Sequence, residues 1–239
     1  MKKLLPSVFL FISCFSFGQT TEVLEESNNS IGLSETKEFH CVPQEVHLSD
    51  AYKRAVLKGT VTNNKKQTIV DIFNDFWKKS NEMGANAFHI DSVQYHSIVS
   101  IKFTITVYSL SETQIDSIYM LYPTNKIYIL GDLNPEALKF KPITIKVNNI
   151  KTELPPTKYL SYQNKIDGET IISKGGLMGT KVWIRWKEDR LPLYLSVNGF
   201  GVGPGSSVGV MGISFNTGRI NSVDMNFGEF LIETLEIAN

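Results

Sequence analysis

The clearest pattern in the chain is helical. Apolar residues recur at three- and four-residue spacing over residues 69–77, which is the spacing of one face of an amphipathic helix. These residues are Ile69, Ile72, Phe73, Phe76 and Trp77. Thr68 or Gln67 stands near the start, and Gly84 stands where a left-handed residue often ends a helix. The sequence therefore predicts a helix that lays an aromatic-rich stripe on a sheet.

Strands are predicted on both sides of this helix. Residues 56–61 precede it and end at a polar turn, and residues 87–95 follow it. Apolar and polar residues alternate at every position over residues 101–107, so one face of that strand is expected to be buried and the other solvated. Together these segments predict a β-α-β-β unit over about residues 46–110.

The remaining residues, 111–239, have mostly strand patterns. Ser111 and Gln114 form a capping box for a short helix. Strands are predicted at residues 127–130, 143–147, 159–162, 170–173, 182–186, 193–197 and 208–215. Asp167 and Gly168 together form a two-residue hairpin signal. We therefore expect a second unit that is mainly antiparallel β.

The end of the chain predicts a short helix on this second sheet. Phe227, Phe230, Leu231 and Leu235 stand at helical spacing there, although a final strand is an alternative. The predicted fold class is α+β: an N-terminal β-α-β-β unit, then a mainly antiparallel β unit with a short C-terminal helix.

The first residues carry the features of an export signal. Lys2 and Lys3 precede a short apolar run that ends at Ile12, and small residues follow, as in a secretory signal peptide. We predict cleavage after Gly18, so that residues 1–18 are the signal peptide, in the style of exported proteins of Bacteroidetes. No segment reaches the roughly 18 or more apolar residues of a transmembrane helix. The predicted location is the periplasm, the cell surface or the extracellular space.

Two features of the N-terminal region leave alternatives open. Phe11, Ile12, Ser13 and Cys14 loosely resemble a lipobox, so a lipid anchor at Cys14 is the alternative to simple cleavage. Residues 19–45 are rich in Thr, Glu, Ser and Asn with scattered apolar residues. Such a composition buries little apolar surface, and a flexible linker is predicted there.

Charge and cysteine content narrow the function classes. The chain has 24 basic and 24 acidic residues, and loss of Lys2 and Lys3 leaves 22 basic residues against 24 acidic ones. With such a balance the protein has no net positive charge that would attract nucleic acid. Of the two cysteines, only Cys41 remains after cleavage, so an internal disulfide is excluded.

A short motif resembles one found in known envelope proteins. Met83, Gly84, Ala85, Asn86, Ala87 and Phe88 form a turn of the GANA type between a helix and a strand. Residues 56–107 thereby resemble small βαββ modules such as that of the Rcs stress-sensor lipoprotein family. The resemblance implies a βαββ fold and an envelope setting for the first unit. The disulfides of that family have no counterpart here, because Cys41 would be alone.

Three kinds of catalytic or metal site are not supported by the residue pattern. The histidines are His40, His47, His89 and His96, and neither they nor Cys41 have the spacing of a metal site. Residues 205–209 match the serine elbow pattern Gly-x-Ser-x-Gly, but a strand is predicted after them where the elbow requires a helix, and all four histidines lie in the first unit. The glycine cluster over residues 199–212 lacks the spacing of a phosphate-binding loop, and a mobile loop between strands is predicted instead. We assign no catalytic residue, no metal and no cofactor.

The strongest candidate for a site is a predicted hairpin of residues 181–187 and 193–197. Strand alternation places one set of side chains on its solvated face, namely Lys181, Trp183, Arg185 and Tyr194. Aromatic rings with cations beside them could stack a sugar or hold an acidic or peptide ligand. The alternative is that another part of the protein covers this face, with Arg185 stacked on Trp183.

These observations predict an exported cell-envelope protein that binds a partner or has a structural role, rather than an enzyme. The partner would be a protein or a glycan, and nucleic acid is not expected. The second hypothesis is a carbohydrate-binding or carbohydrate-processing accessory protein that uses the aromatic face. A hydrolase has only the serine pattern of residues 205–209 in its favour, although two carboxylates brought together by folding would be invisible in a sequence.

Overall fold

The computed structural model describes residues 21–27, 38–62, 68–97, 100–131, 141–175, 179–197, 199–204, 211–216 and 220–238. The predicted signal peptide, residues 1–18, lies outside the described residues, as does Cys14. Among the helices that are described, none combines the length and the apolar character needed to cross a membrane.

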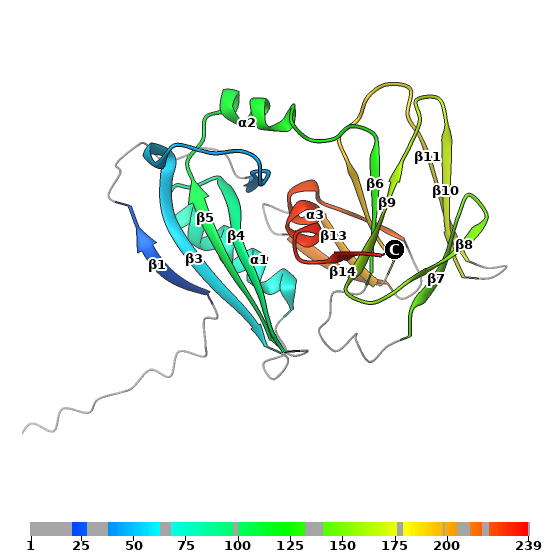
Figure 1. Cartoon of the computed structure of the whole chain (residues 1–239), viewed down its shortest axis with the longest axis horizontal. Helices are drawn as coiled ribbons and strands as arrows, with labels where there is room; N and C mark the ends of the chain where they lie inside the picture. Colours follow the sequence, from blue (N-terminus) through cyan, green and yellow to red (C-terminus); the bar gives the residue numbers. More distant parts are fainter. Residues whose placement is uncertain are drawn as a thin grey trace, which may run out of the picture.

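The first unit is a sheet with helices on one face (Figure 1). Within the described residues its strands run in the order β1-β3-β5-β4-β2. They are β1 (Thr21–Glu26), β2 (His40–Cys41), β3 (Lys53–Thr62), β4 (Ala87–Ser97) and β5 (Ser100–Tyr108), with a 3-10 turn η1 (Asp50–Tyr52) before β3. Neighbours are antiparallel except β2 and β4. The predicted β-α-β-β order is confirmed in β3, α1 (Ile69–Glu82), β4 and β5.

The predicted linker over residues 19–45 is wrong where the structure describes that segment. β1 pairs with β3, and β2 pairs with β4. All but one of the six residues of β1 are exposed, so its side chains give no sign of burial. Its backbone groups are satisfied by the edge of β3 instead. Composition alone could not reveal this pairing, because backbone hydrogen bonds do not require apolar side chains.

Helix α1 begins and ends where the sequence indicates. Thr68 and Asp71 form a capping box at its start, and Gly84 follows its end with a φ of 70°. Phe73 and Phe76 are fully buried against the sheet. Gly59 of β3 allows this close approach, since a Cβ there would lie 2.6 Å from the ring of Phe76. The helix therefore packs directly on the strand that precedes it.

A short helix, α2 (Glu112–Tyr119), follows the first sheet. Both hydrogen bonds of the predicted capping box between Ser111 and Gln114 are present. Ile115 and Ile118 are buried in a small cluster with Val42 and Tyr122. This cluster joins α2 to the segment after β2.

The second unit contains two sheets packed face to face. One has the order β15-β12-β6-β9-β16 and the other β11-β10-β7-β8. The strands are β6 (Lys126–Leu130), β7 (Ile143–Val147), β8 (Ile150–Leu154), β9 (Lys158–Gln163), β10 (Glu169–Lys174), β11 (Thr180–Arg185), β12 (Leu193–Ser196), β15 (Asn221–Val223) and β16 (Glu236–Ile237). Ile127, Ile129 and Leu195 of the first sheet share a core with Ile145, Ile172 and Ile184 of the second. Pairing is mainly antiparallel, with β6-β12 and β9-β16 parallel.

Two turn predictions in this unit need correction. Asp167 adopts the expected positive φ of 60°, but the strands on either side of it, β9 and β10, belong to different sheets. The turn is therefore a crossover rather than a hairpin. In the glycine cluster predicted as a mobile loop, β13 (Gly199–Pro204) and β14 (Met211–Asn216) pair as an antiparallel hairpin. Residues 205–210 lie outside the described part.

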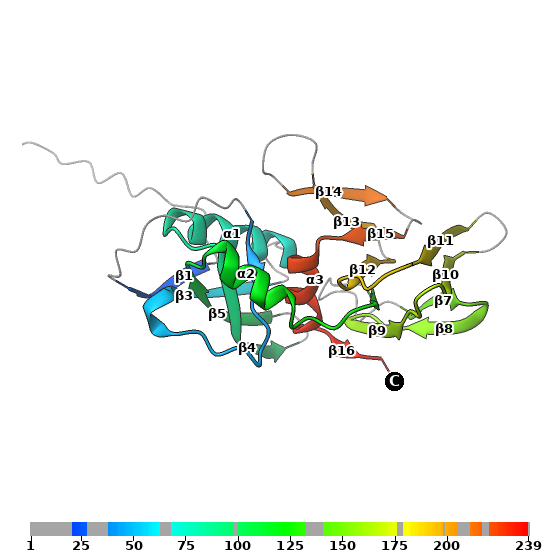
Figure 2. The same cartoon turned by 90° about the horizontal axis from the view of Figure 1, so that it is seen from above.

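Helix α3 (Met225–Ile232) lies between the two units (Figures 1 and 2). The rings of Phe227 and Phe230 pack on Phe73 of α1, with centroids 4.9 and 5.2 Å apart. The opposite side of α3 contacts Tyr194 of β12. The prediction that this helix docks on the second sheet is therefore incomplete, because its phenylalanines belong to the core of the first unit. One continuous core joins the two units.

Candidate functional site

The prediction that residues 181–187 and 193–197 form a hairpin is wrong. β11 pairs with β10, whereas β12 lies in the other sheet, between β6 and β15. Residues 186–192 therefore cross from one sheet to the other. The alternation of apolar and polar residues predicted β11 and β12 individually. The short connection between them suggested that they pair with each other, but they lie in different sheets.

Tyr194 consequently lies in the core and not on a binding face. Its side chain is only 1% exposed, and its ring stacks on Tyr128 at a centroid distance of 5.0 Å and an interplanar angle of 6°. Its hydroxyl donates a hydrogen bond to the carboxyl group of Glu229 on α3. A ligand in solvent cannot reach this ring.

The other three candidates, Lys181, Trp183 and Arg185, do lie together on a solvated face. They are exposed, and Trp183 is 61% exposed. The residues between them, Val182 and Ile184, point into the core between the sheets. Three of the four predicted site residues therefore share one strand and one face.

Cross-strand pairing defines the full set of residues on this face. Opposite β11 stand Ser173, Ile171 and Glu169 of β10, and opposite Ser173 stands Lys146 of β7. Residues directly opposite each other point to the same side of a sheet. We call this surface the open face; its residues are Lys181, Trp183 and Arg185 of β11, Glu169, Ile171 and Ser173 of β10, Thr144 and Lys146 of β7, and Lys151 and Glu153 of β8.

One row across the open face is strongly basic. In register from edge to edge it reads Lys181, Ser173, Lys146 and Lys151. Like charges directly opposite each other are destabilising in a sheet, and Lys146 and Lys151 are such a pair. In the described part of the chain, no carboxylate forms an ion pair with any of these three lysines. The row is thus a positive surface whose lysines have no ion-pair partner in the described part of the chain.

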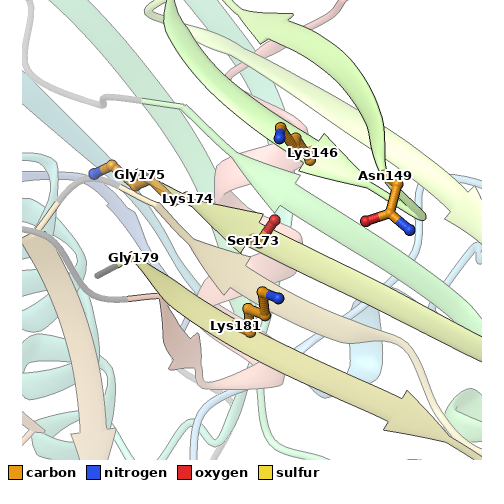
Figure 3. Close-up of a pocket in the computed structure, with 7 residues that line it drawn as sticks. All are labelled: Lys146, Asn149, Ser173, Lys174, Gly175, Gly179 and Lys181. Atoms are coloured by element: carbon orange, nitrogen blue, oxygen red, sulfur yellow. The ribbon is translucent and has the colours of Figure 1, made fainter. Parts of the chain in front are cut away.

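A pocket of about 340 Å³ opens at this row. We call it the lysine pocket; it is lined by Lys146, Asn149, Ser173, Lys174, Gly175, Gly179 and Lys181. Figure 3 shows the polar ends of Lys146, Asn149, Ser173 and Lys181 grouped around the same space. Lys174 differs, because its Nζ donates to the backbone oxygen of Val197. The pocket therefore presents two outward lysines, a hydroxyl and an amide.

The turn that supplies Asn149 was not predicted. Asn148 and Asn149 both have positive φ, 50° and 68°, which is the conformation of a tight hairpin turn. They join β7 to β8. Asn148 is held in place because its Oδ1 accepts from the backbone N–H of Ile171. The consecutive asparagines were the available sequence signal, since asparagine tolerates positive φ better than most residues.

A second group of polar side chains is buried at the junction around α3. Glu229 is 8% exposed, and burial, together with Glu233 and Glu45, raises its pKa to about 8. Burial and the nearby Glu229 raise the pKa of Tyr128 to about 12. Sequence reasoning missed this group, because its members are distant along the chain. Enclosed in the core, it is suited to holding the two units together.

The histidines and Cys41 do not gather into a metal centre within the described residues. His40 is buried, and its Nδ1 lies 2.6 Å from the Tyr119 hydroxyl, while His89 lies 3.1 Å from Asp91. The side chain of His96 lies outside the described part. Burial raises the pKa of the Cys41 thiol, which disfavours the reactive thiolate.

No family model matches this chain, and no curated protein and no solved structure matches it either. The resemblance of residues 56–107 to the Rcs-type envelope modules therefore stays a prediction.

Proposed function

We propose that this chain is an exported cell-envelope protein that acts by binding, and that it holds a negatively charged ligand on the open face. The observation that carries the proposal is the exposure of Trp183 in one strand with Lys181 and Arg185. Large aromatic side chains are usually buried. An exposed tryptophan between two cations combines a stacking platform with donors for an anion.

The arrangement of charge supports an anionic ligand. The row of Lys181, Lys146 and Lys151 has no ion-pair partner among the described residues. A bound anion would relieve the mutual repulsion of these lysines, and that relief would contribute to affinity. Binding should therefore weaken as ionic strength rises, because exposed charges are screened.

The test measures ligand binding to the processed protein at two salt concentrations, with tryptophan fluorescence as the readout. Acidic and neutral glycans should be compared on an array, and Trp183→Ala should abolish binding to the acidic ones. Met120→Ala is the matched control. Met120 is also an exposed apolar residue, but it follows α2 and does not belong to the open face. Binding that survives Trp183→Ala would contradict the proposal.

A second candidate function is carbohydrate binding without a charge requirement, as in an accessory protein of carbohydrate processing. The exposed, flat ring of Trp183 favours it, because sugars stack on such rings. Neutral glycans would then bind as well as acidic ones, and added salt would have no effect. A reproducible protein partner in pull-downs, with no glycan bound, would count against carbohydrate binding and would favour a protein as the ligand of the open face.

Export itself is tested separately. N-terminal sequencing of the protein purified from its host should begin at Gln19 if the proposed cleavage is correct. A lipid-modified cysteine at the N-terminus would instead identify Cys14 as the anchor. A product that begins at Met1 and stays in the cytosol would overturn the envelope assignment.

A further inference from the structure

We infer that the lysine pocket binds one tetrahedral oxyanion of the phosphate or sulfate class, carried by a larger molecule. The inference rests on the proposed function, because it names the chemical group that the open face would recognise. It concerns Lys146, Asn149, Ser173 and Lys181, which come from β7, the β7-β8 turn, β10 and β11.

Two lysines flank the centre of the pocket. Lys146 and Lys181 stand on either side of Ser173, each directly opposite it in register. Neighbouring strands are about 4.8 Å apart, so the two lysine backbones are separated by roughly twice that distance. Two lysine side chains can converge over the central serine from such positions. They would contact one small anion from opposite sides.

Two uncharged hydrogen-bond donors lie beside the lysines. The Ser173 hydroxyl and the Asn149 amide also line the pocket. Across the described residues, neither the Ser173 hydroxyl nor the Asn149 amide makes a hydrogen bond to another protein group. An oxyanion with several acceptor oxygens could use the hydroxyl, the amide and both ammonium groups at once.

The charge of the pocket is positive. The ionisable residues that line the pocket are all lysines. Lys174 is occupied with the oxygen of Val197, which leaves Lys146 and Lys181 to face the ligand. Lysine recognises phosphate as a point charge and does not demand the planar geometry that arginine prefers for carboxylates. Two such charges match a phosphate monoester, which carries close to two negative charges at neutral pH.

The pocket is larger than a single oxyanion and lies near Trp183. A pocket of about 340 Å³ is in the range of small-molecule sites, which begins near 300 Å³, and a bare oxyanion would leave much of it empty. Trp183 stands two residues along β11 from Lys181 on the same face, about 7 Å away. A ligand could therefore place its oxyanion in the lysine pocket and a ring against Trp183.

The test uses the processed chain and inorganic phosphate as the first probe. In a backbone amide NMR titration at low salt, the shifts should saturate and centre on Lys146, Asn149, Ser173 and Lys181. Lys146→Gln and Lys181→Gln should each weaken binding about tenfold, the loss expected for one charge-assisted hydrogen bond. The double variant should lose about a hundredfold.

Lys165→Gln is the matched control. It removes the same charge from an exposed position between β9 and β10, and Lys165 neither belongs to the open face nor lines the pocket. Its binding should change less than about threefold, the scale of a screened surface charge. An equal loss in all three single variants, or shifts that never saturate, would overturn the inference in favour of a general positive surface.

Further probes distinguish the source of the oxyanion. Glucose 1-phosphate is compared with glucose, and vesicles containing phosphatidic acid are compared with phosphatidylcholine vesicles. Preference for either phosphorylated probe, lost in the double lysine variant, supports the inference and identifies a sugar phosphate or a lipid headgroup as the source. If Trp183→Ala abolishes glycan binding while no phosphate probe binds, the inference fails and the proposed function stands. If phosphate saturates the pocket but no ligand depends on Trp183, the proposed function of the open face fails.

Discussion

The hydroxyl of Tyr194 donates a hydrogen bond to the carboxyl group of Glu229 inside the junction between the two units. Tyr194 belongs to β12 of the second unit, and Glu229 belongs to α3, whose phenylalanines pack in the first. Glu233 and Glu45 act on this carboxyl group, and burial, together with its charge, raises the pKa of Cys41, Tyr122, Tyr128 and Tyr159. The chemistry of this one pair therefore bears on how the halves of the protein stay together.

The stability of the protein should depend on pH through Glu229. Its pKa is raised from 4.5 to about 8, so the folded state binds more protons than the unfolded state between these values. Its contribution is thus fully present below about pH 4.5 and is lost as the pH rises towards 8. Denaturant unfolding from pH 4 to 9 should show this decline, by about 2–4 kcal/mol.

The control for this prediction is Glu229→Gln, which keeps the shape but does not ionise. It should flatten the decline and make the protein more stable than the parent near pH 9. Burial also raises the pKa of Glu233, so a smaller slope should remain. An unchanged pH profile in Glu229→Gln would show that this carboxyl group is not the source.

Gly228→Ala should destabilise the junction. A Cβ at this position would lie 2.2 Å from Cγ of Tyr194, and the neighbouring atoms belong to a ring that is fully buried. Overpacking of this kind costs about 1–3 kcal/mol, measurable as a shift in the denaturation midpoint. In a Tyr194→Leu background the same substitution should cost clearly less. Equal costs in both backgrounds would argue against a direct clash with the ring.

Phe230→Ala should destabilise both units together. Phe230 is fully buried and contacts Phe73, Phe76, Phe88 and Phe103. Loss of such a side chain costs about 3–5 kcal/mol. Because one core joins the units, unfolding should stay a single transition at a lower denaturant concentration.

Two fluorescence probes can check that cooperativity. Trp77 reports on the first unit, and Trp183 with Trp186 reports on the second. Trp77→Phe removes the first signal, and the double change of Trp183 and Trp186 to Phe removes the second. The two variants should show the same midpoint change when Phe230→Ala is added; separate transitions would mean that the units are independent.

Cys41 should react slowly with thiol reagents while the protein is folded. Its side chain is 4% exposed, and burial raises its pKa well above 9.0, so the thiolate is scarce at neutral pH. A colorimetric thiol assay should detect no fast-reacting group before denaturant is added and one afterwards. Rapid labelling of the native protein would contradict the buried placement.

Much of the local structure could be predicted from sequence. The capping pairs Thr68–Asp71 and Ser111–Gln114 are formed by neighbours along the chain, and Gly84 ends α1 with the expected conformation. Such features depend on a few adjacent residues, so their signals are complete in the sequence. The exposure of Trp183 also follows from alternation, because its neighbours Val182 and Ile184 occupy the opposite face.

The partners of the strands could not be predicted in the same way. The sequence does not predict β1, because its side chains are mostly exposed and its pairing with β3 is made by backbone hydrogen bonds. Tyr194 was assigned to the binding face because a short connection suggested a hairpin with β11. The sequence does not predict the lysine pocket, because Lys146 and Lys181 are distant in sequence. They lie close together because β7 and β11 both pair with β10.

The sequence by itself determined the periodicity of each segment, and with it which side chains of a strand or helix share a face. Only the tertiary structure decided which faces meet, which of them stays open to solvent and which charges lie side by side. The physical reason is that periodicity is a property of neighbouring residues. Strand pairing and sheet packing, in contrast, depend on the competition of distant segments for the same backbone edges and the same core.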